Sequence, residues 1–140
     1  MSAETLREAS RWLRYAQEDL ATARALTGTS SVPPRHAAWL AQQAAEKAIK
    51  AVLIALQIPF PFVHDLDRLV ALVPEAWGVC DVDADLTALT EFAVDARYPD
   101  DLPDVSAPEA QAGVVDAERV VASVESQLVP WLRAWGGAES

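Results

Sequence analysis

The chain has 140 residues, 51% of them hydrophobic, which suits one domain over residues 1–140 with its core at about 4–135. Its longest apolar run, residues 51–56, is far shorter than the ~20 residues that cross a bilayer, and its first dozen residues lack a secretory signal, so we expect a cytoplasmic protein with no membrane contact. The net charge is −10, and residues 75–109 hold −9 of it (ten acidic residues against one base, Arg97), which disfavours a general nucleic-acid coat protein because such proteins need clustered Lys and Arg.

The first predicted element is an amphipathic helix that should end near Gly28, since glycine suits the left-handed position after a helix. Small and apolar residues recur every three or four positions on one face of this helix. They are Leu6, Ala9, Leu13, Ala16, Leu20 and Ala23. The opposite face carries Arg7, Arg11, Arg14 and Glu18. A plain solvated surface is the favoured interpretation, and the three arginines could alternatively meet phosphates or an acidic partner.

A second long helix is predicted from Pro33 and Pro34, which fit a helix start, to about Gln57. Placed at steps of about 100°, its polar residues share one arc. They are Gln42, Gln43, Glu46, Lys47, Lys50 and Gln57. The apolar arc is much wider, so this helix is predicted to pack on two sides as the centre of a bundle. Trp39 lies within the polar arc, and we expect it to face a cleft or to be buried against a second subunit.

A short third helix is expected from about residue 64 to 72, after two loop prolines. A fourth helix is expected to be capped by Asp81 or Asp83 and to reach about Asp95.

The last predicted helix begins with a capping box at Ser106 and Glu109, and Pro130 is expected to end it or kink it. Residues 136–140 are expected to be a frayed tail. Since no segment alternates with a period of two, the sequence predicts an all-α, up-and-down bundle of four or five helices with a short extra helix.

Motifs of most enzyme classes are missing from the sequence, which has no Gly-rich phosphate loop, no GxSxG elbow and no HExxH. With only His36 and His64 there is no histidine cluster for a metal, and the alternating aspartates at 81–85 lack the Gly and Glu of a calcium loop. The single Cys80 is expected to act as a small apolar residue. We therefore expect neither a metal nor a cofactor.

One run on the second helix resembles a known family. Residues 41–53 read Ala-Gln-Gln-Ala-Ala-Glu-Lys-Ala-Ile-Lys-Ala-Val-Leu, and His-Asp-Leu follows at 64–66. Together they resemble the second-helix signature of the HEPN domain (higher eukaryotes and prokaryotes nucleotide-binding), in its small prokaryotic stand-alone form, and the resemblance runs from about Arg11 to Trp131. It implies a helical bundle and a homodimer whose fourth-helix ends share a cleft.

The tripeptide Arg-Tyr-Pro at 97–99 resembles a sequence at the cleft where the family places its nucleotide or RNA site. An arginine can hold a phosphate by two hydrogen bonds, and a neighbouring tyrosine can stack on a base. The resemblance makes Arg97 and Tyr98 ligand-binding candidates, although Arg97 could instead neutralise nearby aspartates. Glu46, Lys47 and Lys50 are further candidates for a polar cleft, unless Glu46 and Lys50 form an ordinary surface ion pair.

Ribonuclease members of the family pair an arginine with a histidine four to six residues later. Here Asp101, Leu102 and Pro103 follow Arg97 at that spacing, so His64 would have to substitute, although a structural or capping role is favoured for it. Two hypotheses follow. The favoured one is a noncatalytic HEPN module that dimerises and binds a nucleotide or a minimal nucleotidyltransferase partner, as in toxin–antitoxin-type pairs of bacteria. The alternative is an atypical or degenerate HEPN toxin ribonuclease.

Overall fold

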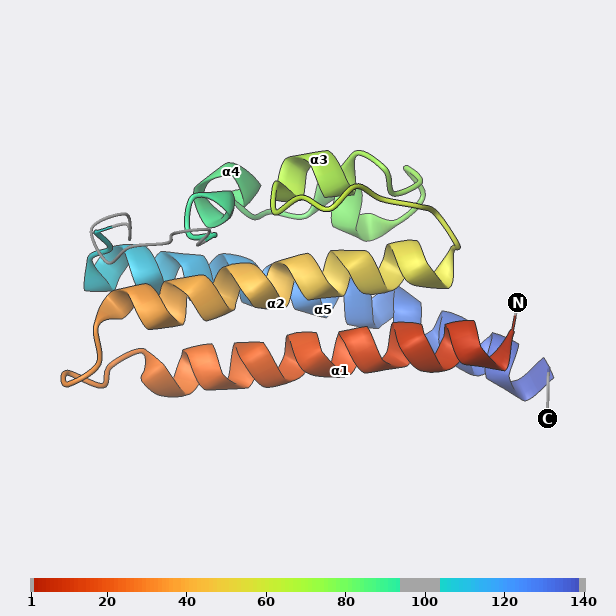
Figure 1. The fold of residues 1–140 in the computed structure, drawn as a ribbon, viewed down its shortest axis with the longest axis horizontal. Coiled ribbons are helices and arrows are strands. Elements are labelled where there is room, and N and C mark those ends of the chain that lie inside the picture. The colour runs from red at the N-terminus through yellow and green to blue at the C-terminus, as the bar shows by residue number, and fades with distance from the viewer. Residues whose placement is uncertain (1, 94–103, 139–140) are drawn as a thin grey trace.

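The computed structural model describes residues 2–93 and 104–138, and this part of the chain is helical throughout its regular elements, with no strand. Three long helices run side by side, with α2 beside α1 and α5 behind both (Figure 1). Two short helices and a 3₁₀ turn form a second layer over α2 and α5. The elements are α1 (Ala3–Leu26), α2 (Pro34–Ala55), α3 (Leu66–Val70), η1 (Gly78–Asp81), α4 (Leu86–Thr90) and α5 (Ala107–Ala138). The predicted all-α bundle is confirmed.

Helix α1 follows its prediction closely. The Ser2 hydroxyl accepts a hydrogen bond from the Thr5 N–H at 3.1 Å and caps the start. The helix ends at Leu26, and Gly28 has a φ of +89°, the left-handed conformation for which glycine was expected. All six residues of the predicted apolar face are buried, so the period of the sequence identified the packed side of this helix correctly.

Helix α2 is the central rod, as predicted, and packs against α1 on one side and α5 on the other. Its many buried alanines allow the neighbouring backbones to approach closely. The helix stops at Ala55, slightly before the predicted end, because Gln57 adopts a φ of +57°. The Ile58 N–H then donates to the Leu53 carbonyl at 2.8 Å, which closes the helix in a Schellman motif.

The second layer differs from prediction in its helix bounds. Helix α3 is shorter than the expected 64–72, and the Asp65 carboxylate caps it by accepting from the Arg68 N–H at 3.2 Å. The prediction that Asp81 or Asp83 caps the fourth helix is wrong. The cap is Asp85, whose carboxylate reaches the N–H three residues further on at 2.9 Å, so α4 begins only at Leu86. It ends at Thr90, and the predicted end at residue 95 lies outside the described residues.

Helix α5 begins with the predicted capping box, in which Ser106 and Glu109 exchange hydrogen bonds of 3.1 and 3.2 Å. Hydrogen bonds from Ser106 hold the pKa of the Glu109 carboxyl below its ordinary value. The helix passes through Pro130 and continues to Ala138, so the expectation of a tail from residue 136 is wrong for its first three residues. Pro130 is exposed, which leaves the carbonyl that it frees, on Ser126, to water.

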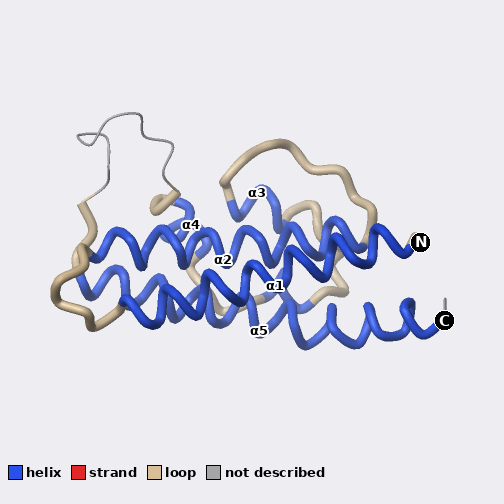
Figure 2. The backbone as a smooth tube through the Cα atoms, turned by 60° about the horizontal axis from the view of Figure 1, so that its bottom comes forward, coloured by secondary structure: helices blue, strands red, loops and turns tan. Residues whose placement is uncertain are grey.

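The termini of the described chain lie near each other at one end of the bundle, and the α1–α2 turn lies at the opposite end (Figure 2). Within residues 2–93 and 104–138, the helices are either too short or too polar to cross a bilayer.

Candidate functional site

A row of polar side chains on α2 is buried inside the protein. Gln42, Glu46 and Lys50 are spaced four residues apart, so they stack on the same side of the helix. Their exposed fractions are 0%, 4% and 4%. This row is part of the arc that the sequence marked as polar, and that arc is covered here because the loop after α2 and a tryptophan of α1 pack over it.

Glu46 lies at the centre of this row and accepts three side-chain hydrogen bonds. Its Oε1 accepts from Gln42 Nε2 at 3.0 Å and from His64 Nδ1 at 2.7 Å, and its Oε2 accepts from Lys50 Nζ at 3.0 Å. Gln42 Nε2 also donates to the His64 carbonyl at 3.2 Å. In the described part of the chain, every buried side-chain nitrogen and oxygen has a partner. The row is therefore a closed network rather than a set of free groups.

The protonation state of Glu46 follows from these contacts. Burial alone raises the pKa of a carboxyl group because it disfavours the charged form. The hydrogen bonds from Gln42, His64 and Lys50, together with the Lys50 charge, outweigh burial and hold the pKa of Glu46 below its ordinary value. Glu46 is therefore a carboxylate at neutral pH, paired with a buried ammonium group.

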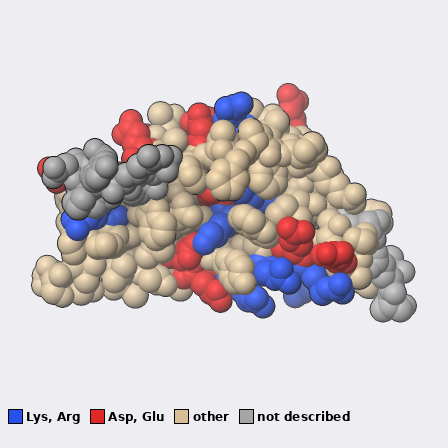
Figure 3. Space-filling model, viewed as in Figure 1, with Lys and Arg blue, Asp and Glu red and all other residues tan. Residues whose placement is uncertain are grey.

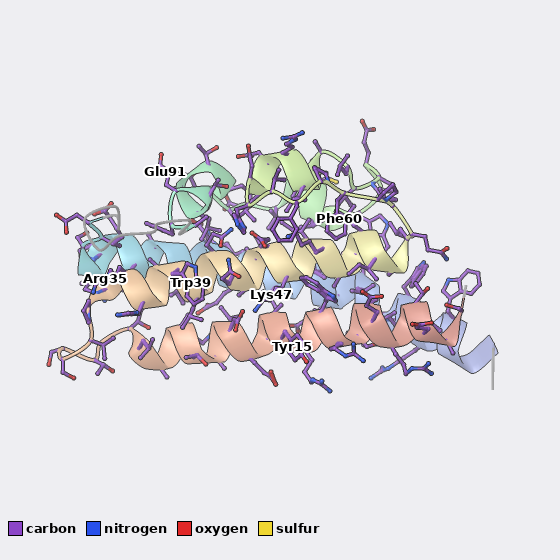
Figure 4. All side chains as sticks on the ribbon, viewed as in Figure 1. Tyr15, Arg35, Trp39, Lys47, Phe60 and Glu91 are labelled. Atoms are coloured by element: carbon purple, nitrogen blue, oxygen red, sulfur yellow. The ribbon has the colours of Figure 1, made fainter. Side chains whose placement is uncertain are left out.

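The ammonium group of Lys50 is also surrounded by aromatic rings. Its Nζ lies 5.9 Å from the ring centroid of Trp12, 5.5 Å from that of Phe60 and 5.6 Å from that of Phe62. Figure 4 shows Phe60 on the side of α2 that faces the second layer. Phe62 is 93% exposed but still faces the cation, so its ring covers the network from outside. We refer to Trp12, Phe60 and Phe62 as the aromatic cap.

The predicted ligand set is divided by this arrangement. Glu46 and Lys50 come together, but the expectation of a surface ion pair is wrong, because the pair is buried. Lys47 directly follows Glu46 but lies on the α1 side of α2 (Figure 4), where its ammonium group pairs with the Asp19 carboxylate at 2.6 Å. Arg97 and Tyr98 lie outside the described residues.

His64 is the member of the network that reaches the surface. Its side chain is 40% exposed, and one ring nitrogen is held by the Glu46 carboxylate. The predicted capping role falls to Asp65 instead, because α3 begins one residue later. A histidine oriented by a carboxylate can accept a proton at its second ring nitrogen, so this dyad is the chemically most capable group in the described part of the chain.

The sequence reasoning missed the aromatic cap and the central role of Gln42. The spacing of Gln42, Glu46 and Lys50 was a usable signal, because three polar residues at intervals of four are aligned on one side of a helix. The pair Phe60 and Phe62, which alternates with Pro59 and Pro61 directly after the helix, was a second signal.

The fold can be placed among known proteins. A family model described as HEPN domain matches residues 9–127, which is most of the chain. The chain belongs to the HEPN domain family. This protein is also similar to TT1696 from Thermus thermophilus, whose crystal structure superposes with a TM-score of 0.63. The two are 29% identical, and the match covers 84% of this chain and 96% of that one. A search of curated proteins finds no match.

The signature residues of this HEPN chain therefore have a physical explanation. Glu46 and Lys50 form the buried ion pair, and His64 and Asp65 tie the loop to α2 and cap α3. The signature holds the second layer of the fold onto the central helix.

Proposed function

We propose that this HEPN protein is a noncatalytic module that dimerises and binds a nucleotide or a minimal nucleotidyltransferase partner, as in toxin–antitoxin-type pairs. The observation that carries the proposal is the closure of the α2 network, in which Glu46 and Lys50 bind each other and their neighbours. Glu46 and Lys50 are buried and satisfy each other, so they hold the loop after α2 in place and present no free polar atom to a ligand. The sequence adds that Asp101, Leu102 and Pro103 stand where ribonuclease relatives place a histidine.

The ligand proposed for this module is a nucleotide bound by Arg97 and Tyr98, through a phosphate and a stacked base. Lys47 is a further contributor from α2, because it is partly exposed and its ammonium group has a single carboxylate partner, Asp19, among the described residues. Titration of the protein with ATP and GTP, followed by calorimetry, tests this ligand. Saturable binding that is lost in Arg97→Ala supports it, whereas equal affinity in Arg97→Ala would remove Arg97 from the site.

The proposed dimer places the fourth-helix ends of two subunits across a shared cleft and buries Trp39 of α2 against the second subunit. Trp39 on α2 is 39% exposed and Tyr15 on α1 is 41% exposed (Figure 4), so both rings offer apolar surface whose burial would stabilise a dimer. Light scattering at micromolar concentration should give the mass of a dimer, and Trp39→Glu should give that of a monomer. Trp135→Glu is the matched control, since Trp135 is 41% exposed on α5. A monomeric wild-type protein over this range would refute the dimer.

A ribonuclease remains the second candidate, because the Glu46 carboxylate orients a histidine that reaches the surface. Incubation of the purified protein with total RNA distinguishes the two. The module proposal expects no cleavage above that of a His64→Ala control. Cleavage that disappears in His64→Ala but persists in His36→Ala would overturn it in favour of the enzyme.

A partner protein would be found by a tagged pull-down from the native host, with mass spectrometry of what is bound. A stoichiometric nucleotidyltransferase supports the partner role. Recovery of clean protein with neither partner nor nucleotide would count against both binding roles.

A further inference from the structure

A second surface, which shares no lining residue with the α2 network, forms an open groove between α1 and the C-terminal part of α5. The groove has a volume of about 680 Å³ and is lined along α1 by Arg7, Arg11 and Arg14. Leu6 of α1 and Leu132 of α5 add apolar lining. The residues that line it include no acidic side chain, although Glu4 and Glu18 stand beyond its two ends on α1. We call this surface the arginine groove.

The three arginines of this groove are not engaged by other described residues. Elsewhere in the described chain, Arg24 pairs with Glu118 at 3.0 Å and Lys47 with Asp19 at 2.6 Å. By contrast, no ion pair or side-chain hydrogen bond links the groove arginines to another residue in 2–93 or 104–138. Arg14 is stacked on the ring of Tyr15 at 5.5 Å, which positions its guanidinium but leaves its donors unused.

The spacing of the arginines indicates the shape of what they would bind. Positions 7, 11 and 14 share one face of α1 and rise by about 6 Å and about 4.5 Å along the axis. Carboxylates on a second helix, at positions i, i+4 and i+7, repeat with the same rises and can meet the three guanidinium groups in register. The aliphatic side chains that flank them on such a helix would pack on Leu6 and Leu132.

We infer that the arginine groove binds an acidic amphipathic helix of a partner protein. The inference deepens the partner-binding part of the proposed function and rests on it. It assigns the contact to α1 and α5, away from the network on α2 and from His64.

The charge distribution favours a short acidic helix over a nucleic acid. Figure 3 shows basic and acidic side chains side by side along α1, and the whole chain has a net charge of −10. Glu4 and Glu18 flank the three arginines on the same face of the helix, so the positive patch is short. A helix that carries its carboxylates only opposite the three arginines avoids these two glutamates, because its acidic stretch of about 10 Å matches the length of the arginine stripe. A long polyphosphate chain would extend from this patch of about 10 Å onto acidic surface and be repelled there.

The test is fluorescence anisotropy with a labelled peptide of about four helical turns, carrying glutamates at i, i+4 and i+7 beside a leucine face. A scrambled peptide of the same composition is the control ligand. Arg11→Glu should weaken binding about tenfold, since it removes one ion pair and adds a repulsion in its place. Arg68→Glu on α3 is the matched control, because Arg68 is exposed in the second layer and the charge change is the same. We expect it to leave the affinity unchanged.

Three results would overturn the inference: equal binding of the scrambled peptide, equal weakening by Arg68→Glu, or Arg11-dependent binding of a labelled oligonucleotide that exceeds that of the peptide. The pull-down distinguishes failure of the arginine-groove inference from failure of the proposed partner-binding function. If wild type and Arg11→Glu capture the same protein partner equally well, the proposed function stands and the groove is not the binding site. If the peptide binds but no cellular partner is captured, the groove stands as a binding site and the proposed partner role fails.

Discussion

Replacing Glu46 by alanine is the sharpest test of the buried network. The substitution leaves the Lys50 ammonium group buried without its carboxylate and removes the acceptor of Gln42 and His64. Breaking one side of a buried ion pair typically costs about 3 to 5 kcal/mol. Hydrogen bonds to a charged group contribute about 1.5 to 3 kcal/mol each, and the aromatic cap still stabilises the cation by about 1 kcal/mol. We therefore expect a loss of about 3 kcal/mol in the free energy of unfolding.

Urea unfolding followed by circular dichroism measures this loss as a lower midpoint at an unchanged m-value. The double variant Glu46→Ala with Lys50→Met should recover part of the loss, because it removes the unpaired charge as well. Lys47→Met is the control, since the Lys47–Asp19 pair is partly exposed and should cost at most about 1 kcal/mol. A loss below about 1 kcal/mol in Glu46→Ala, or no recovery in the double variant, would refute the reasoning.

Three further predictions concern the same fold. Phe62→Ala should lower stability by about 0.5 to 1 kcal/mol in urea unfolding, although Phe62 is almost fully exposed, because its ring contacts the Lys50 cation; no change would exclude Phe62 from the aromatic cap. Gly28→Ala should destabilise by about 1 kcal/mol because of the positive φ, whereas Gly136→Ala, in a helix with open space around it, should be neutral or slightly stabilising; equal effects on the thermal midpoint would contradict this. The pKa of the Glu46 carboxyl is lower in the folded protein, so the stability that Glu46 contributes is complete above the ordinary carboxyl pKa of 4.5 and is lost as the pH falls through the lower folded pKa. The loss of stability at acid pH should therefore be less steep in Glu46→Gln, and identical profiles would show that Glu46 does not have a depressed pKa.

The sequence predicted those parts of the fold that depend on local chemistry. The buried face of α1, the proline start of α2 and the Ser106–Glu109 capping box each depend on residues within one or two turns of each other, and the structure confirms all three. Gly28 is a similar case, because a left-handed residue after a helix is a property of the backbone alone.

The parts that were missed depend on contacts between distant segments. The polar residues of α2 are predicted from the sequence to be solvent-exposed, because periodicity shows which residues share one side of a helix but not which other segments cover that side. Trp12 lies 38 positions before Lys50, and only the antiparallel pairing of α1 with α2 brings them together. The cap of α4 was missed for another reason: aspartates at 81, 83 and 85 are equally good caps by residue type, and tertiary packing selects the last.

The closed network also explains why the HEPN signature identifies this fold more clearly than any reaction. A buried ion pair is rarely more stabilising than apolar residues of the same volume, so its value lies in fixing one arrangement. Here Glu46 and Gln42 hold the side chain and the carbonyl of His64, which places Asp65 at the start of α3. In this chain these residues therefore set the position of the second layer. Contacts with a partner should accordingly be sought on the outer surfaces of this protein, and the arginine groove on α1 is one whose arginines have no ion pair with a described residue.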